Sequence, residues 1–200
     1  MGKTTRHVCG IEYIEGEHLG VKFRLRPASF FQVNDGVKDA IYSKVRELLD
    51  LSNTEVLLDL FSGIGILTTV LASDDYDTYS IEIEPSAVKD ADEMVHLNNS
   101  PRVHNICGDV NIELPKIIEA NAGKRFTVVV DPPRKGLGVS ICETLIKSNA
   151  DNIVYISCDS ATLARDLATL ADVYTVTYVQ PWDMFPNTDQ VETLVHLKHK

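Results

Sequence analysis

Short apolar runs alternate with helical stretches along most of this chain, and this alternation constrains the fold more than any other feature. Five runs are predicted to be strands, at residues 55–61, 78–84, 103–107, 126–131 and 152–158. Apolar residues at helical spacing predict helices over 34–49, 66–72, 85–97 and 161–171. Strands that alternate with helices favour an α/β fold with a parallel, doubly wound sheet and right-handed crossovers.

Both ends of the chain depart from this alternation. Residues 173–182 and 190–199 are predicted to be two strands with no helix between them, which indicates an antiparallel element at one edge of the sheet. Residues 1–30 show no such pattern. We therefore expect residues 1–30 to be an N-terminal extension or the end of a preceding domain, and residues 31–200 to form the main domain.

Length and charge restrict the class of protein. The 200 residues, 44% of them hydrophobic, are enough for one compact domain, and no stretch of about 18 apolar residues predicts a membrane span. We expect an intracellular protein, a monomer, without distinguishing cytoplasm, nucleus and mitochondrion. The net charge of −10 is unfavourable for a nucleic-acid binder, because phosphate contacts need Lys and Arg. A local basic surface, or one on another domain, would reconcile the two.

A glycine-containing turn links the strand 55–61 directly to the next helix. The turn has the sequence DLFSGIG, and Gly63 and Gly65 allow a ligand to approach the backbone near free N–H groups of the helix. By itself this signal is weak. It is compatible with a nucleotide phosphate, and equally with a tight turn that binds nothing.

Acidic residues at the end of the next strand sharpen this interpretation. Glu82 and Glu84 follow about 20 residues after the turn, where a carboxylate can accept both ribose hydroxyls of an adenosine. Thr68 stands where a third glycine would mark a dinucleotide site, which favours S-adenosylmethionine instead. Glu82 is the preferred ribose ligand and Glu84 the alternative. Asp109, after the third strand, is predicted either to lie near the adenine amino group or to cap the helix that follows.

The segment DPPRKGL, residues 131–137, follows the fourth strand. Ligands of open α/β sheets collect at the carboxyl ends of the strands, so Asp131 should face the same crevice as Gly63 and Glu82. Arg134 and Lys135 would place positive charge at the rim, where phosphates of a substrate could dock. The alternative is a structural turn with solvated basic side chains.

One of the four cysteines stands apart from the others. Cys158 ends the fifth strand immediately before a helix, and the field of a helix N-terminus favours thiolate over thiol. Cys107 and Cys142 are predicted to be packing residues, and Cys9 an exposed or flexible thiol. No CxxC pair is present, so neither a zinc site nor a redox dithiol is predicted, and the thiols should be free. A cysteine in an apolar strand is more often inert, but Cys158 shares its crevice with Asp131.

A carboxylate stands at the start of the last predicted strand. Glu192 follows the segment 183–189, which Pro186 interrupts. A carboxylate held in a partly apolar environment can have a raised pKa and act as a base. Taken alone, Glu192 would be expected to be exposed on an edge strand.

Together these motifs resemble the RNA uracil-5 methyltransferases, the family of the tRNA T-loop uridine methylase and the large-subunit rRNA uridine methylases. The segments that carry the resemblance are FRLRPASFFQVN (23–34), DLFSGIG (59–65), IEIEPSAVKDA (81–91), DPPRKGL (131–137), ISCDSATLARDL (156–167) and DMFPNTDQVETL (183–194). The spelling is most similar to the eukaryotic-type tRNA enzymes. The resemblance implies a class I S-adenosylmethionine-dependent methyltransferase (Rossmann-like) fold, with a mostly parallel seven-stranded sheet and one antiparallel edge strand. Residues 31–200 would then be the catalytic domain.

The resemblance also implies a role for individual residues around the cofactor. Gln32 would contact S-adenosylmethionine, and Phe61 with the glycine turn would line its pocket. Glu82 would bind the ribose. Asp131 would lie where the cofactor and the target uracil meet.

For the reaction, the resemblance implies that Cys158 attacks the uracil and that Glu192 is the base. Thiolate addition at carbon 6 makes carbon 5 nucleophilic, and a base must remove the carbon 5 proton after methyl transfer. A hydrogen-bond donor near the uracil O4 would stabilise the enolate, but the sequence does not identify it. The preferred target is uridine 54 of the tRNA T-loop. The alternatives are an rRNA uridine methylase of the same chemistry and a cofactor- or RNA-binding module without turnover.

Four positions depart from the usual spelling of the family. Ser62 stands in place of Cys, Asp159-Ser160 in place of Asn-Pro, and Gln190 in place of His. Asp159 beside the thiolate should disfavour its charged form. RNA, most often tRNA, is the expected partner, with an additional N-terminal domain needed to bind it; no membrane and no metal ion are expected.

Overall fold

The computed structural model describes residues 7–27, 29 and 34–200. Its main sheet has seven strands in the order β5-β4-β3-β6-β7-β9-β8. The strands are β3 (Val56–Leu60), β4 (Asp77–Glu82), β5 (Val103–Cys107), β6 (Phe126–Val130), β7 (Asn152–Ser157), β8 (Tyr174–Trp182) and β9 (Glu192–His199). Strands β3 to β7 pair in parallel, and β9 pairs antiparallel with both β7 and β8. The predicted, mostly parallel sheet with an antiparallel edge is confirmed; β9 lies one strand in from that edge.

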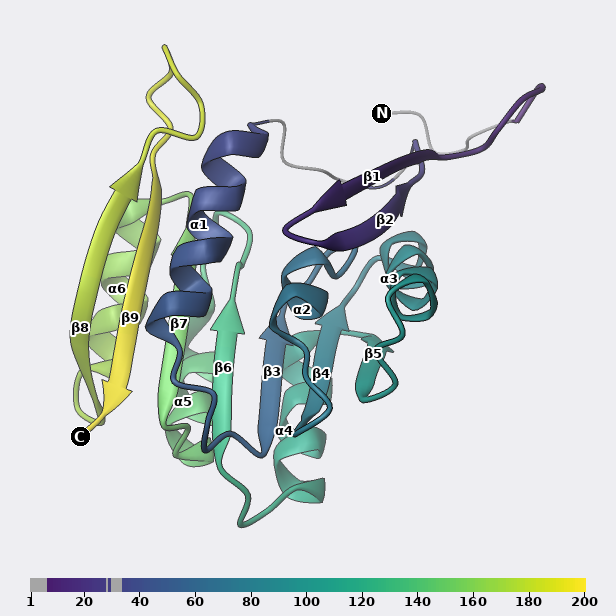
Figure 1. Ribbon diagram of the computed structural model, residues 1–200. Helices are drawn as coiled ribbons and strands as arrows, with labels where there is room; N and C mark the ends of the chain where they lie inside the picture. Colours follow the sequence, from purple (N-terminus) through teal and green to yellow (C-terminus); the bar gives the residue numbers. More distant parts are fainter. Residues whose placement is uncertain (1–6, 28, 30–33) are drawn as a thin grey trace.

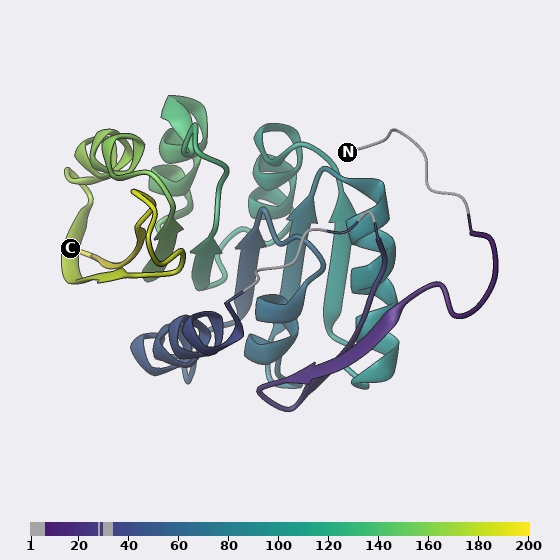
Figure 2. The same cartoon turned by 90° about the horizontal axis from the view of Figure 1, so that it is seen from above.

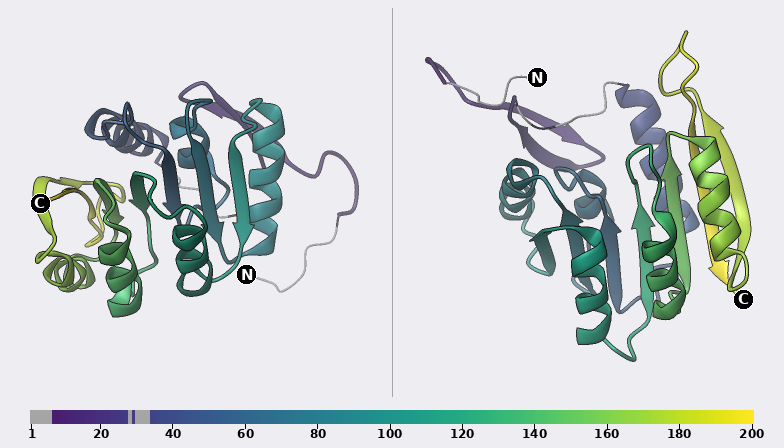
Figure 3. Two further views of the ribbon diagram at one scale, coloured as in Figure 1. Left: turned by 90° about the horizontal axis from the view of Figure 1, so that it is seen from below. Right: turned by 180° about the vertical axis from the view of Figure 1, so that it is seen from behind.

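Six helices cover the two faces of the sheet. They are α1 (Asp35–Leu48), α2 (Ile66–Leu71), α3 (Pro85–Leu97), α4 (Val110–Ala120), α5 (Gly138–Ser148) and α6 (Ser160–Leu170). Helices α1, α2 and α3 lie on one face, and α4, α5 and α6 lie side by side on the other (Figures 2 and 3). None of the helices in the described part of the chain has the length and apolar character to cross a membrane.

The helix α5 was not predicted from the sequence, and its start explains why. Its N-cap is Leu137, whose side chain makes no capping hydrogen bond, and Gly136 and Gly138 beside it have positive φ. The sequence therefore has no capping Ser, Thr, Asp or Asn that would indicate the start of this helix. By contrast, Glu84 caps α3, Asp109 caps α4 and Asp159 caps α6.

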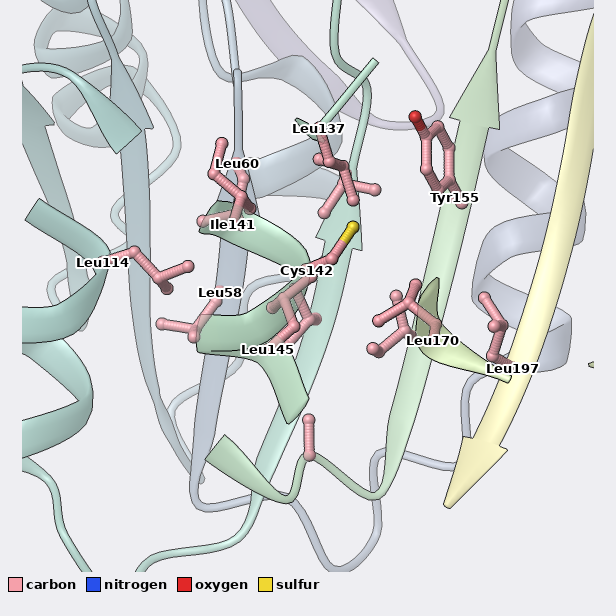
Figure 4. Packing of buried hydrophobic residues seen from close by; sticks show 14 of the residues in the cluster. Leu58, Leu60, Leu114, Leu137, Ile141, Cys142, Leu145, Tyr155, Leu170 and Leu197 are labelled. Carbon is pink, nitrogen blue, oxygen red and sulfur yellow. The ribbon is translucent and has the colours of Figure 1, made fainter. Parts of the chain in front are cut away.

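The core forms where the helices meet the sheet. The strands β3 and β6 are buried along their whole length, as expected for strands covered on both faces. Figure 4 shows side chains from α4, α5 and α6 gathered over β3, β6 and β7, among them Leu114, Leu145 and Leu170. A second cluster includes Ile41 and Val45 of α1. These two layers hold the strand ends in fixed positions relative to one another.

The N-terminal part forms a separate hairpin of β1 (Ile14–His18) and β2 (Val21–Leu25). Val21 and Phe23 pack with Ile66 of α2 and with Met94 of α3. The hairpin therefore lies against the helices near the carboxyl ends of the parallel strands (Figure 1). The predicted boundary between residues 30 and 31 lies outside the described residues.

Candidate active site

A cavity of about 930 Å³ opens at the carboxyl ends of the parallel strands. It brings together predicted site residues that come from loops far apart in the sequence. These residues are Phe61, Gly63, Glu82, Glu84, Asp109, Asp131, Arg134, Lys135, Cys158 and Glu192. Gln32 lies outside the described residues. Gly65 instead serves as the N-cap of α2, where its φ is 81° and an added Cβ would come within 3.2 Å of the Ala91 Cβ.

The glycine turn is held in shape by a carboxylate from the neighbouring strand. Glu82 Oε2 accepts a hydrogen bond from the Gly63 N–H at 3.0 Å, and Oε1 accepts one from the Glu84 N–H at 2.8 Å. Phe61 has a φ of 65°, which is strained for a residue with a side chain. Strain of this kind persists where surrounding contacts impose it and is common at ligand sites. The carboxylate at the end of β4 is thus fixed at the cavity rather than free in solvent.

The two other acidic residues of this half combine two roles. Glu84 accepts hydrogen bonds from the Ser86 N–H at 3.5 Å and the Ser86 hydroxyl at 3.0 Å. Asp109 accepts one from the Asn111 N–H at 2.8 Å, and the hydrogen bonds from Asn111 lower its pKa. The capping role weighed for Asp109 is confirmed, and its side chain also lines the cavity; a place near the adenine amino group stays a prediction.

Glu192, the first residue of β9, is buried at the other side of the cavity. Only 4% of its surface is exposed, and its Oε2 has no hydrogen-bond partner among the described residues. Burial raises the pKa of Glu192. The expectation of a solvent-exposed edge residue is wrong, since β8 forms the edge and β9 lies inside the sheet.

Asp131 follows β6 and faces the same space. Burial raises its pKa to about 8, and the nearby charges of Glu192 and Asp59 act in the same direction. When no cation is present, two neighbouring carboxyl groups in a poorly solvated cavity are more stable if at least one of them is protonated. A bound cation would reverse this preference.

Cys158 is partly exposed in this cavity, at the end of β7. Burial raises the pKa of the Cys158 thiol, Glu192 and Asp131 raise it further, and a backbone hydrogen bond and Arg134 oppose the rise. The sequence predicted a thiol whose ionisation is favoured, whereas burial and two carboxylates disfavour the thiolate here. Asp159 is not the opposing charge: its side chain accepts hydrogen bonds from the backbone of α6.

Comparison with known proteins fits this arrangement. The family model for tRNA (Uracil-5-)-methyltransferase matches residues 11–200. The chain belongs to this family. It is 39% identical over 197 residues to an uncharacterised RNA methyltransferase of Enterococcus faecalis, covering 98% of this chain and 43% of the relative. An uncharacterised RNA methyltransferase of Clostridium tetani is 41% identical over 196 residues, with 98% and 42% covered.

A solved structure of a tRNA methyltransferase shares the fold. The Pyrococcus abyssi tRNA (uracil-54, C5)-methyltransferase, in complex with S-adenosyl-L-homocysteine, aligns with a TM-score of 0.82 at 28% identity, covering 98% of this chain and 48% of that one. The fold is that of S-adenosylmethionine-dependent methyltransferases, as predicted. The chain spans less than half the length of these curated relatives. The likeness to eukaryotic-type enzymes stays a prediction.

The residues of this methyltransferase-family cavity suit S-adenosylmethionine. Glu82 stands fixed beside the glycine turn, and Ile83, 66% exposed, offers an apolar surface next to it on the same cavity wall. A carboxylate in this position could accept hydrogen bonds from ribose hydroxyls, and the apolar surface could contact a flat ring. On the other side, the buried carboxylates Asp131 and Glu192 are complementary to a sulfonium cation. Among the described residues, no cluster of His, Cys, Asp and Glu could hold a metal ion.

Among the cavity residues that were not predicted from the sequence are two polar side chains of α1. Lys38 and Tyr42 of α1 line the cavity, and Lys38 forms an ion pair with Asp35 at 2.9 Å. Burial raises the pKa of Tyr42, and the charge of Asp131 adds to this effect. Their spacing of four residues in a predicted helix placed both on one face. Nothing in the sequence, however, showed that this face turns toward Asp131.

The rim of the cavity holds one cation in a defined position. Arg134 donates from Nη2 to Gln190 Oε1 at 2.6 Å, so Gln190 takes part in the site at the position where His is usual in the family. Ser62 also lines the cavity, and its buried Oγ has no hydrogen-bond partner among the described residues. Ser62 and Gln190, which both depart from the usual family spelling, thus line the cavity.

Proposed function

We propose that this chain is the catalytic domain of an enzyme that transfers a methyl group from S-adenosylmethionine to carbon 5 of a uridine in RNA, through a covalent adduct between Cys158 and the uracil. One observation carries the proposal. Cys158, Asp131 and Glu192 meet in one cavity that also contains the glycine turn held by Glu82. A thiol, a buried carboxylate pair and a nucleoside-binding turn are the parts that this chemistry needs.

Cys158, which is partly exposed, acts first, after its thiol has lost its proton to solvent. The sulfur adds to carbon 6 of the uracil, and the electron pair of the ring double bond moves toward O4 to form an enolate. Charge then develops on O4, and donors at the rim of the cavity stabilise it. The cofactor supplies the methyl group as a sulfonium, from which carbon 5 takes it.

Glu192 completes the reaction. Its carboxylate removes the proton from carbon 5, the ring double bond re-forms, and the bond between carbon 6 and the Cys158 sulfur breaks. The burial that raises the pKa of Glu192 also makes its carboxylate a stronger base. Its Oε2, which has no partner among the described residues, is available to receive this proton.

We propose uridine 54 of the tRNA T-loop as the target. Membership of the tRNA (uracil-5-)-methyltransferase family and the fold shared with the Pyrococcus abyssi tRNA (uracil-54, C5)-methyltransferase support this choice. A base must leave its stack to enter the cavity, at a cost of a few kcal/mol that a loop lowers. An rRNA uridine is the second candidate, because the bacterial relatives are named only as RNA methyltransferases.

The experiment that tests the proposal uses the full-length protein with S-adenosylmethionine and either purified tRNA or rRNA. Mass spectrometry of the digested nucleosides should show 5-methyluridine in tRNA and none in rRNA. Methylation of rRNA alone would overturn the tRNA choice, and unmodified uridine in both would overturn the activity. A 5-fluorouridine RNA should form a covalent adduct with the wild type but not with the Cys158→Ala variant.

We further propose that an additional RNA-binding domain precedes residues 31–200 in the whole protein. The net charge of −10 and the small number of cations at the cavity support this proposal. The isolated chain should bind S-adenosylmethionine but should bind RNA only weakly at physiological salt. Nanomolar affinity of residues 1–200 for tRNA in a filter-binding assay would contradict it.

A further inference from the structure

A buried carboxylate of α6 holds the loop that follows β6. Asp166 is 1% exposed, and its Oδ2 accepts hydrogen bonds from the Leu137 N–H at 2.7 Å and the Tyr155 hydroxyl at 2.9 Å. Its Oδ1 accepts a longer one from the Gly138 N–H at 3.3 Å. A buried carboxylate is costly unless it is paired in this way. Two of these bonds come from backbone N–H groups of the loop, so they fix the path of the chain.

Two neighbours of Asp166 on α6 hold the same loop by its carbonyl groups. The Thr162 hydroxyl donates to the Arg134 carbonyl at 3.0 Å, and Arg165 Nη2 donates to the Lys135 carbonyl at 2.8 Å. Arg165 in turn donates from Nε to Asp166 Oδ1 at 3.0 Å. We call these three side chains of α6 the loop clamp.

The loop fits the clamp only because it carries a glycine in the middle. Gly136 has a φ of 71°, and a Cβ at this position would overlap Asp166 Oδ2 and lie 2.8 Å from Arg165 Nη2 and 3.2 Å from the Thr162 Cβ. All three members of the clamp therefore touch the site where a side chain would stand. The loop and the clamp are complementary in shape as well as in hydrogen bonding.

The same helix begins directly after Cys158. Asp159 is the N-cap of α6, so the residue before the cap is the thiol and the loop clamp follows within the first two turns. We propose that Asp166 is a positioning residue of the methyl-transfer site, which ties the loop after β6 to the helix of Cys158 and thereby keeps Arg134 facing the thiol. The inference rests on the proposed function, because it assigns Cys158 the role of nucleophile.

Arg134 matters because of the other charges around the thiol. Glu192 from β9 and Asp131 from the end of β6 both disfavour the thiolate, and Arg134 favours it. Gln190 engages Arg134 from the other side of the rim. A loop released from the clamp would move this cation, while Glu192 would keep its place on β9 and Asp131 would stay beside β3, where its N–H donates to the Leu60 carbonyl at 3.2 Å. The thiol should then ionise at higher pH.

The test measures the reactivity of Cys158 as a function of pH. Wild type, Asp166→Asn and Leu163→Ala are each treated with iodoacetamide from pH 6 to 10, and modification of the Cys158 peptide is followed by mass spectrometry. The amide of the D166N variant would offer one acceptor oxygen instead of two. The midpoint of its profile should therefore rise by about half a unit to one unit, with about three- to tenfold slower alkylation at pH 7.5.

The control variant lies on the same helix but leaves the clamp intact. Leu163 is 5% exposed and packs into the core, so Leu163→Ala destabilises α6 without removing any of the loop bonds. Its alkylation profile should match the wild type, although its unfolding midpoint in urea falls. An equal rise in both variants would overturn the proposal, since a loosened helix alone would then explain it.

A second variant approaches the clamp from the loop. Gly136→Ala should displace the loop and raise the midpoint in the same direction as D166N, and the double variant should show less than the sum of the two shifts. Unchanged profiles in both single variants would overturn the clamp whether or not the enzyme methylates RNA. Absence of 5-methyluridine with the wild-type protein would overturn the proposed function and leave these alkylation results standing.

Discussion

The two halves of the cavity use their carboxylates in opposite ways. On the side of β4 and β5, Glu82 and Asp109 accept hydrogen bonds from backbone N–H groups at 2.8–3.0 Å. On the side of β6 and β9, burial raises the pKa of Asp131 and of Glu192, and Glu192 keeps one oxygen without a partner among the described residues. The carboxylates of the first half therefore have hydrogen-bond partners without a ligand. In the second half, one oxygen of Glu192 has none among the described residues.

This difference fits the proposed function, in which the first half binds the cofactor and the second half takes part in the reaction. A carboxylate that is already hydrogen-bonded keeps its charge and its position, which suits recognition of ribose hydroxyls. A carboxylate without partners gains from a proton or a cation, which suits a base beside a sulfonium. Variants of the two halves should therefore fail in different assays.

The largest effect is expected at Cys158. Cys158→Ala removes the proposed nucleophile, so methylation of RNA should fall by about a thousandfold or more, while the dissociation constant of S-adenosylmethionine stays within about twofold. Single-turnover methylation and calorimetry measure the two quantities. Cys142→Ala is the matched control: Cys142 is buried in the core, so stability should fall but the rate per folded molecule should not. A C158A enzyme with normal turnover would contradict the proposal that the half of the cavity around Asp131 and Glu192 carries out the reaction through Cys158.

Glu192→Gln should have the next largest effect. Loss of the proposed base should slow completion of the reaction by about 10²- to 10⁴-fold. Because Cys158 is intact, the methylated adduct should accumulate and appear as a protein–RNA band on a denaturing gel. Equal loss of adduct and product would show instead that Glu192 acts before or during the attack of the thiol.

A third prediction concerns stability as a function of pH. Asp131 has a pKa of about 8 in the folded protein and an ordinary value near 4 when unfolded, so the folded state binds the proton more tightly. Its contribution to stability is full below about pH 4 and is lost as pH rises toward 8. In urea unfolding of the cofactor-free protein, the free energy of unfolding of the wild type should be lower at pH 8.5 than at pH 5.

In the Asp131→Asn variant this decline should shrink by an amount on the order of 1 to 3 kcal/mol. It should not vanish, because burial also raises the pKa of Asp59 to about 7. A variant that declines as steeply as the wild type would show that Asp131 is charged in the folded protein.

The smallest effect is expected in the binding half. Glu82→Gln retains one acceptor for the backbone N–H groups of the turn, so binding of S-adenosylmethionine should weaken by about tenfold, with little change in the rate at saturating cofactor. Glu84→Gln is the control, since Glu84 caps α3 with bonds that Gln can also accept. Equal weakening of S-adenosylmethionine binding in both variants would contradict a particular role of Glu82 in binding the cofactor.

The sequence predicted most of the fold because strands and caps are local signals. The strand 103–107 and the helix from Pro85 to Leu97 have the predicted bounds. The carboxyl ends of parallel strands meet by topology, so Gly63, Asp131 and Cys158 could be placed together without a structure. The roles assigned to these residues stay predictions.

Contacts between distant segments could not be predicted. The loop clamp joins residues 28 to 30 positions apart through hydrogen bonds to backbone atoms, which leave no pattern in the side chains of the loop. The ionisation of Cys158 was misjudged for a similar reason. It depends on how deeply Glu192 and Asp131 are buried beside the thiol, and burial is a property of the assembled sheet.

The direction of β9 has a consequence for how such a site can diversify. Because β9 runs against its neighbours, its first residue, Glu192, reaches the end of the sheet where the parallel strands finish, paired with Trp182. The next residue, Thr193, pairs with Ser157, directly before Cys158. Insertions or deletions in the loop 183–191 can therefore alter what approaches the cavity while the strand register keeps the carboxylate in place. An engineer seeking a new RNA preference could randomise residues 186–189 of this loop and keep Gln190, which engages Arg134 beside the thiol.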